Sequence, residues 1–214
     1  LAGVIPREIG KWHFLQQLAL DFNSLTGSIP VEIFNLSMLS FLSLVLYNFF
    51  PNSNWNGKRY MKNFRAKDCF WWIGSFPQLH LLSLSNNSFT ASISNMSKLE
   101  EISLSYNYLA GNIPIGIFNI SALQIIDLTN NGLCGVLPSD MCYHLPGLSF
   151  VGLSNNKLNG QLPSSNLAQC SELRVLSLSY NEFGGSIPKE IGALKKLEEL
   201  YLGHNYLEGK TLAN

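Results

Sequence analysis

Residues 173–192 read LRVLSLSYNEFGGSIPKEIG, and this stretch decides the fold because its pattern returns along most of the chain. The recurring pattern is L-x-x-L-x-L-x-x-N-x-L-x-G-x-I-P, with Ile, Val or Phe replacing a leucine in some copies. Copies start at residues 15, 39, 79, 99, 123, 148, 173 and 197, and a partial copy occupies residues 1–14. Neighbouring starts are 24 residues apart at 15–39, 99–123 and 173–197, and 25 apart at 123–148 and 148–173. A period of this length predicts a solenoid in which each copy forms one turn.

Each position of the pattern has a structural reason. The L-x-x-L-x-L segment alternates as a strand does, so its leucines point inward and the intervening residues outward. One turn cannot bury its apolar side alone, whereas stacked turns build one continuous core. We therefore predict a single α/β repeat solenoid over residues 1–214, a right-handed coil with a concave parallel β-sheet and an irregular or 3-10 convex side. Strands are expected at residues 17–21, 41–45, 81–85, 101–105, 125–129, 150–154, 175–179 and 199–203.

An asparagine follows the strand segment in most copies. We expect its side chain to turn inward and bond backbone groups of the bend, because a buried amide is tolerated only when it is paired. Asn156→Ala should therefore destabilise the fold, whereas Ser154→Ala is expected to be a neutral, exposed change. The predicted ladder consists of Asn23, Asn87, Asn107, Asn131, Asn156, Asn181 and Asn205.

The string L-x-G-x-I-P-x-x-I-G, at residues 1–10 and with Phe in first place at 183–192, resembles the plant-specific leucine-rich repeat. That repeat is typical of the ectodomains of plant receptor-like serine/threonine kinases, of receptor-like proteins and of polygalacturonase inhibitors. The phrases IFNLS at 33–37 and IFNIS at 117–121 are similar to those of the pattern-recognition receptor kinases.

The resemblance implies a non-catalytic fragment of a receptor-kinase ectodomain that lacks the kinase domain. Such a fragment would sense a peptide or protein ligand at the extracellular face of the plasma membrane, together with a co-receptor kinase. The membrane span would lie in a C-terminal part that this chain does not contain. The alternatives are a secreted inhibitor of a cell-wall-degrading enzyme and a receptor-like protein without a kinase.

Residues 47–76 interrupt the repeat. Leu39 and Leu79 are 40 residues apart, and the segment between them holds Trp55, Trp71 and Trp72 among several basic residues. It can be read as an insertion or damaged repeat, as a functional island resembling the ligand-binding insertions of steroid-sensing plant receptors, or as a nucleic-acid patch. We favour the first interpretation.

Composition excludes several functions. Lys+Arg and Asp+Glu are both 14, whereas binding to nucleic acid needs a basic excess. We expect no catalytic residues, no metal and no cofactor, because the sequence contains no H-E-x-x-H, G-x-S-x-G or C-x-x-C motif. Cys134 and Cys142 are eight residues apart and could form a disulfide. The family resemblance suggests instead an isolated buried thiol at Cys142, so we expect free cysteines.

Two further features concern the surface. The sequons at Asn35, Asn86, Asn95 and Asn119 predict N-glycosylation and therefore secretion. Asn35, Asn95 and Asn119 share one phase on the return path, where sugar would leave the concave face open. Aromatic residues at outward strand positions are of the type that anchors peptide interfaces. The predicted ligand-binding residues are Tyr106, Asp127, Tyr180, Tyr201 and His204, with Phe22 in the same phase before the irregular segment.

Overall fold

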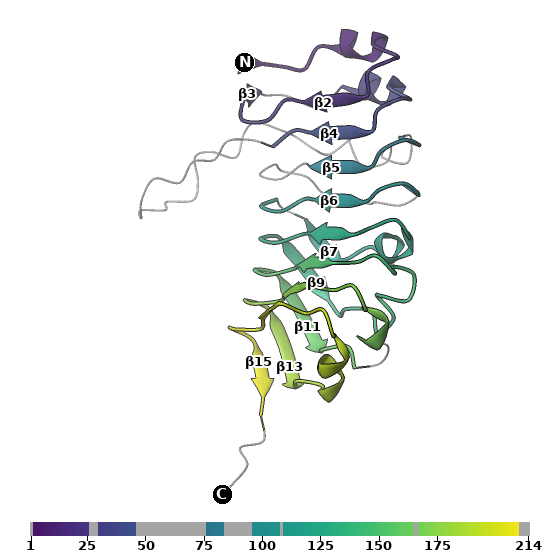
Figure 1. Ribbon diagram of the computed structural model, residues 1–214. Helices are drawn as coiled ribbons and strands as arrows, with labels where there is room; N and C mark the ends of the chain where they lie inside the picture. Colours follow the sequence, from purple (N-terminus) through teal and green to yellow (C-terminus); the bar gives the residue numbers. More distant parts are fainter. Residues whose placement is uncertain are drawn as a thin grey trace, which may run out of the picture.

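A parallel sheet of eight short strands forms one side of a coil (Figure 1). The computed structural model describes residues 2–25, 30–45, 76–83, 96–107, 109–164 and 167–209. Consecutive turns lie next to one another, so the sheet order follows the chain. Its strands are β2 (Gln17–Ala19), β4 (Phe41–Ser43), β5 (Leu81–Ser83), β6 (Glu101–Ser103), β8 (Ile125–Asp127), β10 (Phe150–Gly152), β12 (Val175–Ser177) and β14 (Glu199–Tyr201).

All eight predicted strands are present and begin at the predicted residues, but each ends two residues earlier. The asparagine side chains explain the early ends. The amide of Asn107 and that of Asn131 both donate to the Leu104 carbonyl, at 2.9 and 3.0 Å. That oxygen is thus bonded to side chains rather than to the next strand, so the regular strand pattern ends there, although the Tyr106 N–H still donates to the Thr129 carbonyl of the next turn.

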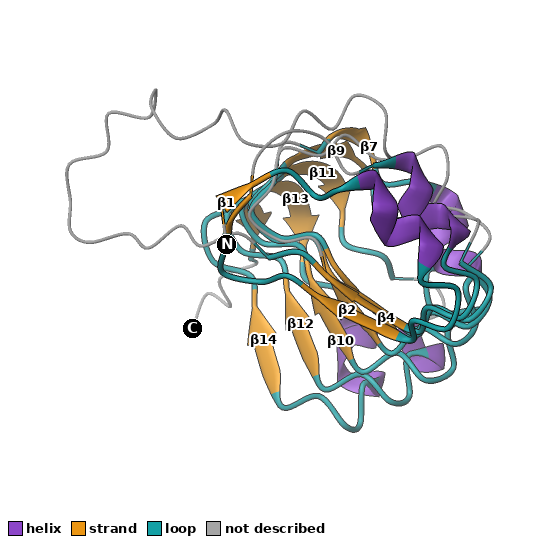
Figure 2. Cartoon of the chain, turned by 90° about the horizontal axis from the view of Figure 1, so that it is seen from above, coloured by secondary structure: helices purple, strands orange, loops and turns teal. Residues whose placement is uncertain are grey.

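A second parallel sheet lines another side of the coil, and the sequence analysis did not predict it. Its strands are β7 (Ala110–Asn112), β9 (Gly132–Gly135), β11 (Lys157–Gln161), β13 (Glu182–Ser186) and β15 (Tyr206–Glu208). Near the N-terminus, β1 (Ala2–Gly3) pairs with β3 (Ser24–Leu25). Viewed from above, the coil shows the first sheet, the second sheet and the helices on three different sides (Figure 2).

Short 3-10 helices form the third side, as predicted for the convex surface. They are η1 (Arg7–Lys11), η2 (Val31–Asn35), η4 (Ile115–Asn119), η5 (Leu167–Gln169) and η6 (Lys189–Ala193). Four of them begin directly after the proline of the I-P pair, whose fixed φ suits the start of a helical turn. For example, the Ile9 N–H donates to the Pro6 carbonyl at 3.2 Å.

One continuous apolar core fills the coil, built from the inward residues of every turn. The irregular segment does not interrupt the sheet, because β4 pairs in register with β5, with Leu42 opposite Leu82. Phe76, the last residue of that segment, is only 2% exposed and packs against Phe34 with ring centroids 5.4 Å apart. Residues 46–75 lie outside the described part of the chain.

Candidate functional site

The asparagine side chains tie each turn to the turn before it. Asn181 donates to the carbonyls of Leu178 in its own turn (3.1 Å) and Leu153 in the preceding turn (2.9 Å). Its side-chain oxygen accepts the Leu158 N–H at 3.0 Å. Asn131, Asn156 and Asn205 repeat this arrangement, and Asn23 and Asn107 bond the bends of their own turns. Asn87 lies outside the described residues.

Ser154 is buried and bonded, so the expectation that it is exposed was wrong. Its side chain is 8% exposed, and its hydroxyl lies 2.7 Å from that of Ser177 on the neighbouring turn. The tight packing of successive parallel turns covers this position, which lies just beyond the strand. Ser154→Ala is therefore not a neutral control.

Two of the predicted binding residues lie on strands of the first sheet. Asp127 ends β8 and is half-buried, whereas Tyr201 ends β14 and is exposed. In most of these strands the middle residue is buried in the core, so the first and third residues face outward. The Asp127 carboxylate accepts the Thr129 N–H at 3.1 Å.

The other predicted binding residues form a row just after the strands. Phe22, Tyr106, Tyr180 and His204 all have left-handed backbone, with φ between 54° and 57°. Hydrogen bonds between turns hold the row in register, such as the Tyr106 N–H to the Thr129 carbonyl at 2.8 Å. The rings of Tyr180 and His204 stack at 4.0 Å with an interplanar angle of 12°. We call this row, which also contains Asn130 and Asn155, the rim.

Phe22 follows a strand of the same sheet as the other predicted residues. The strands β2, β4, β5 and β6 pair without a break, so the irregular segment does not shift the phase of the first turns. Phe22 is 67% exposed. The structure thus places an aromatic side chain at each end of one uninterrupted sheet, and it separates the predicted residues into strand and rim positions.

Two titratable groups on the first sheet have raised pKa values. Burial and the negative charge of Asp127 raise the pKa of Glu101, a residue that the sequence analysis did not select. The Tyr201 hydroxyl donates to the Glu199 carboxylate at 2.8 Å, and this bond together with the glutamate charge raises the pKa of Tyr201. The sequence signal that could have identified Glu101 was its outward strand position, beside that of the predicted binding residue Asp127.

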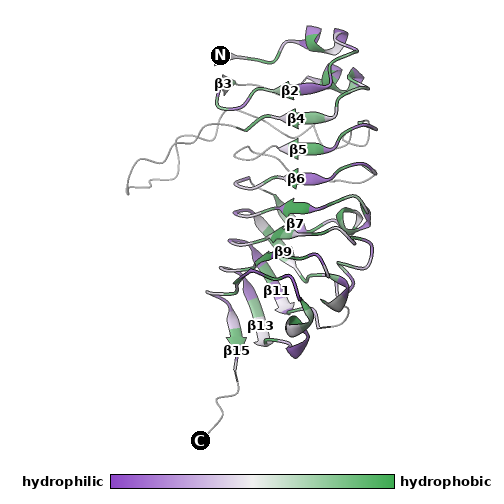
Figure 3. Cartoon of the chain, in the orientation of Figure 1, coloured by the Kyte–Doolittle hydropathy of each residue, from purple (hydrophilic) through white to green (hydrophobic). Residues whose placement is uncertain are grey.

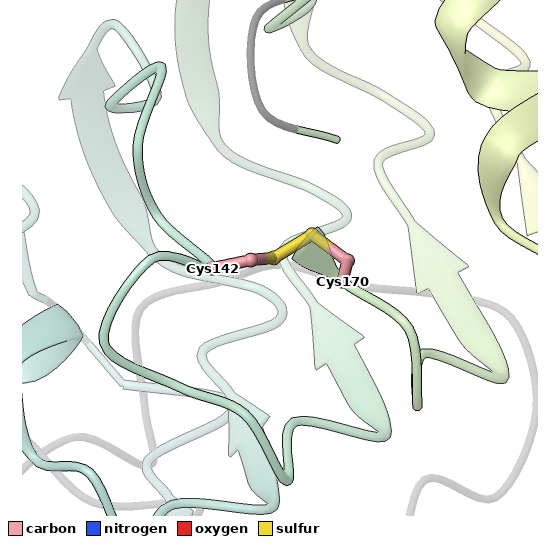
Figure 4. The surroundings of a disulfide bond; sticks show 2 residues. All are labelled: Cys142 and Cys170. Carbon is pink, nitrogen blue, oxygen red and sulfur yellow. A yellow bond between two sulfur atoms is a disulfide. The ribbon is translucent and has the colours of Figure 1, made fainter. Parts of the chain in front are cut away.

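The expectation of free cysteines was wrong for Cys142, which forms a disulfide with Cys170 (Figure 4). Their Cα atoms are 5.2 Å apart, within the usual range for a disulfide. Cys142 occupies the same place in its turn as Leu167 does in the next, and Cys170 the same place as Leu145. The bond therefore joins two core positions of adjacent turns. Cys134 is free and half-buried.

The described sequons lie away from the first sheet. Asn35 ends η2 and Asn119 ends η4, and both are exposed. Asn86 and Asn95 fall outside the described residues. Sugar on Asn35 or Asn119 would project from the helical side of the coil, as the sequence phase predicts.

No group of three or more His, Cys, Asp and Glu residues in the described part of the chain is placed to hold a metal ion. Over the same residues, no helix is long and apolar enough to cross a membrane.

The stacked strands, the asparagine ladder and the second sheet define a leucine-rich-repeat solenoid. Family models described as leucine rich repeat match residues 14–36, 97–158 and 172–194, and the chain belongs to this family. Among curated proteins it is similar to Receptor-like protein 39 of Arabidopsis thaliana, at 32% identity over 141 residues. That match covers 63% of this chain and 14% of the relative, so the chain spans a small part of such a protein.

Solved plant receptor ectodomains share the fold. The ectodomain of the Arabidopsis thaliana receptor kinase GASSHO1/SCHENGEN3, in complex with CASPARIAN STRIP INTEGRITY FACTOR 2, has a TM-score of 0.82 and 34% identity. The match covers 97% of this chain and 23% of that one. The Arabidopsis receptor kinase HAESA, in complex with the peptide hormone IDA and the co-receptor SERK1, has a TM-score of 0.82, 31% identity, and coverage of 97% and 32%.

Proposed function

We propose that this chain is a ligand-binding part of a plant cell-surface receptor ectodomain, and that it binds a peptide or protein on the outward face of its first sheet. The observation that carries the proposal is the sheet itself. In the described part of the chain no helix or strand lies over this face (Figure 2), and aromatic side chains stand along its rim. The similar ectodomain of GASSHO1/SCHENGEN3 was solved with CASPARIAN STRIP INTEGRITY FACTOR 2, and that of HAESA with the peptide hormone IDA.

Rim and strand residues supply complementary contacts. Tyr106, Tyr180 and Tyr201 are 47%, 52% and 49% exposed, so each can lose a large area to solvent when a partner docks. Aromatic anchors of this kind dominate the binding energy of many interfaces. Asp127 and His204 add polar groups to the same sheet. The stack of Tyr180 on His204 fixes both rings before binding, which lowers the entropy lost on association.

Two features support a location outside the cell. A buried disulfide persists in oxidising compartments and is rare in the cytosol. The exposed sequons Asn35 and Asn119 are accessible to the glycosylation machinery of the secretory pathway. The second partner that we propose is a co-receptor kinase, since the HAESA ectodomain was solved with the co-receptor SERK1.

Selection from a phage library of random linear peptides, with the purified chain as bait, tests the proposed face. The selected peptides should bind Tyr180→Ala at least tenfold more weakly than the parent, because loss of an aromatic anchor costs about 2 kcal/mol. Lys189→Ala, on the exposed start of η6, is the matched control and should bind as the parent does. If the selected peptides bind Tyr180→Ala normally but no longer bind Lys189→Ala, the binding site lies on the helical side.

A further inference from the structure

An apolar stripe runs across the outward face of the first sheet. The first residue of each central strand faces outward and is half-buried, and register places these residues side by side. Figure 3 shows the hydrophobic colouring of β4 and β5 beside the more hydrophilic β6. The stripe consists of Phe41, Leu81, Ile125, Phe150 and Val175, with Glu101 in the place between Leu81 and Ile125.

Glu101 interrupts this stripe at its centre, and the carboxylate of Asp127 lies beside the stripe. Glu101 lies directly opposite Ile125, and Asp127 is the next outward residue on the same strand as Ile125. Burial and the charge of Asp127 both oppose ionisation of Glu101 and raise its pKa. The ion pairs of the described residues lie elsewhere, joining Arg7 to Glu32, Arg174 to Glu198 and Lys196 to Glu172.

The charged strand residues on this face are all acidic. The first and third positions of the eight strands contain Glu101, Asp127 and Glu199 and no lysine or arginine. A partner that covers the apolar stripe must also desolvate the two central carboxylates. Burying them without a positive partner is unfavourable, so the face selects against neutral and acidic ligands at this point.

An aromatic ring lies near one of these carboxylates, that of Asp127. A Cβ atom added to Gly152 would lie 2.8 Å from the Asp127 Oδ1 and 2.9 Å from the Phe150 Cε1. The ring edge of Phe150 and the Asp127 carboxylate therefore both border the space above Gly152, which has no side chain. A carboxylate next to an aromatic ring is a combination that suits a guanidinium or ammonium group.

We propose that the ligand of this face is an extended peptide whose basic side chain lies between Glu101 and Asp127, with apolar side chains on either side of it. This inference rests on the proposed function and names the chemical class of the ligand. The basic group would pair with both carboxylates. Its apolar neighbours would cover Leu81 and Phe41 in one direction and Phe150 and Val175 in the other.

The spacing of the strands determines how many residues separate the basic and the apolar side chains of the peptide. Adjacent strands lie about 4.8 Å apart, whereas an extended chain advances about 3.3 Å per residue. Two inter-strand spacings separate Glu101 from Phe150 in the sheet order, and two separate Glu101 from Phe41. The apolar side chains should therefore lie roughly three residues before and after the basic one.

The test compares peptides selected from the same random library by the parent chain and by a Glu101→Gln/Asp127→Asn variant. The parent should enrich lysine or arginine with apolar residues about three positions away. The variant should still select apolar residues but lose the basic preference. Fluorescence anisotropy with one synthetic peptide from the parent selection should show at least a tenfold loss of affinity for the variant. The loss should be smaller at high salt. Glu182→Gln, an exposed change on β13, is the matched control and should leave binding unchanged.

Each outcome separates the ligand class from the proposed function. If the parent enriches peptides that depend on Tyr180 but carry no basic residue, the ligand class is wrong and the proposed binding face stands. If the basic preference persists in the double variant, Glu101 and Asp127 do not create it and the inference fails. If no selected peptide depends on Tyr180, both the face and the ligand class are overturned. Circular dichroism of each variant checks that it is folded.

Discussion

Reducing the Cys142–Cys170 disulfide should lower the stability of the solenoid by about 3.5 kcal/mol. The bond closes a loop with a sequence separation of 28, and the chain-entropy relation for a loop of this size gives that value at 25 °C. For a chain of this length, about 3.5 kcal/mol corresponds to a fall in Tm of roughly 7–14 °C. Both sulfurs remain in place after reduction, so the change isolates the covalent bond from the packing of the buried cysteines.

Thermal melts followed by circular dichroism, with and without reductant, measure this effect. The parent should melt lower in reductant, whereas Cys142→Ala/Cys170→Ala should melt at one temperature in both conditions. Cys134→Ser removes the free thiol on β9 and should keep the full response of the parent. A thiol assay must show that reduction has released two additional thiols. If it does so while the Tm of the parent stays constant, the bond contributes nothing to stability and the loop-entropy reasoning is refuted.

Three further changes test the fold in denaturant titrations. Asn156→Ala should destabilise by roughly 1–3 kcal/mol, because it leaves the Leu133 N–H unpaired and removes one of the two amide donors to each of the Leu128 and Leu153 carbonyls, whereas the exposed Lys157→Ala should stay within about 0.5 kcal/mol. Gly160→Ala should cost roughly 1–3 kcal/mol, because its φ is +78° and a Cβ would lie 2.7 Å from Val136; Gly192→Ala, with open space around it, should be near neutral. The folded pKa of Glu101 lies above its ordinary value of 4.5, so folding favours the protonated form and the parent loses stability as pH rises through that folded pKa. Glu101→Gln should therefore be more stable than the parent at neutral pH, with the difference vanishing below pH 4.5; a variant less stable at neutral pH would contradict the assigned cause.

The first sheet was predictable because every turn repeats the same inward residues. Leu176 and its equivalents recur at a fixed place in each copy, and only one arrangement buries all of them together. The ends of the strands were less predictable. They depend on which group donates a hydrogen bond to the Leu104 carbonyl. Tertiary geometry decides whether that donor is an amide side chain or a backbone N–H.

The second sheet escaped prediction because its strands have poor intrinsic strand propensity. Residues such as Gly184 and Gly185 predict a bend when one copy is read alone. Stacking overrides that preference, since equivalent segments of adjacent turns run side by side and can exchange backbone hydrogen bonds. The disulfide was missed for a related reason. Cys142 and Cys170 differ by one 25-residue period plus three residues, about one turn of a 3-10 helix, so they meet across adjacent turns although they do not occupy equivalent positions.

The same regularity explains why the sequence reveals the fold more readily than the binding site. The repeat constrains inward residues, and it leaves outward residues free to vary at little cost to stability. On the outward face, the informative residues are therefore those whose residue type is unfavourable for the local backbone conformation or charge environment. The left-handed rim position suits asparagine, as at Asn130 and Asn155, yet Tyr106 and Tyr180 occupy it at a conformational cost. Glu101 likewise stands where its neighbours are apolar and its charge is opposed by Asp127. We propose binding of a partner as the reason for each of these residues.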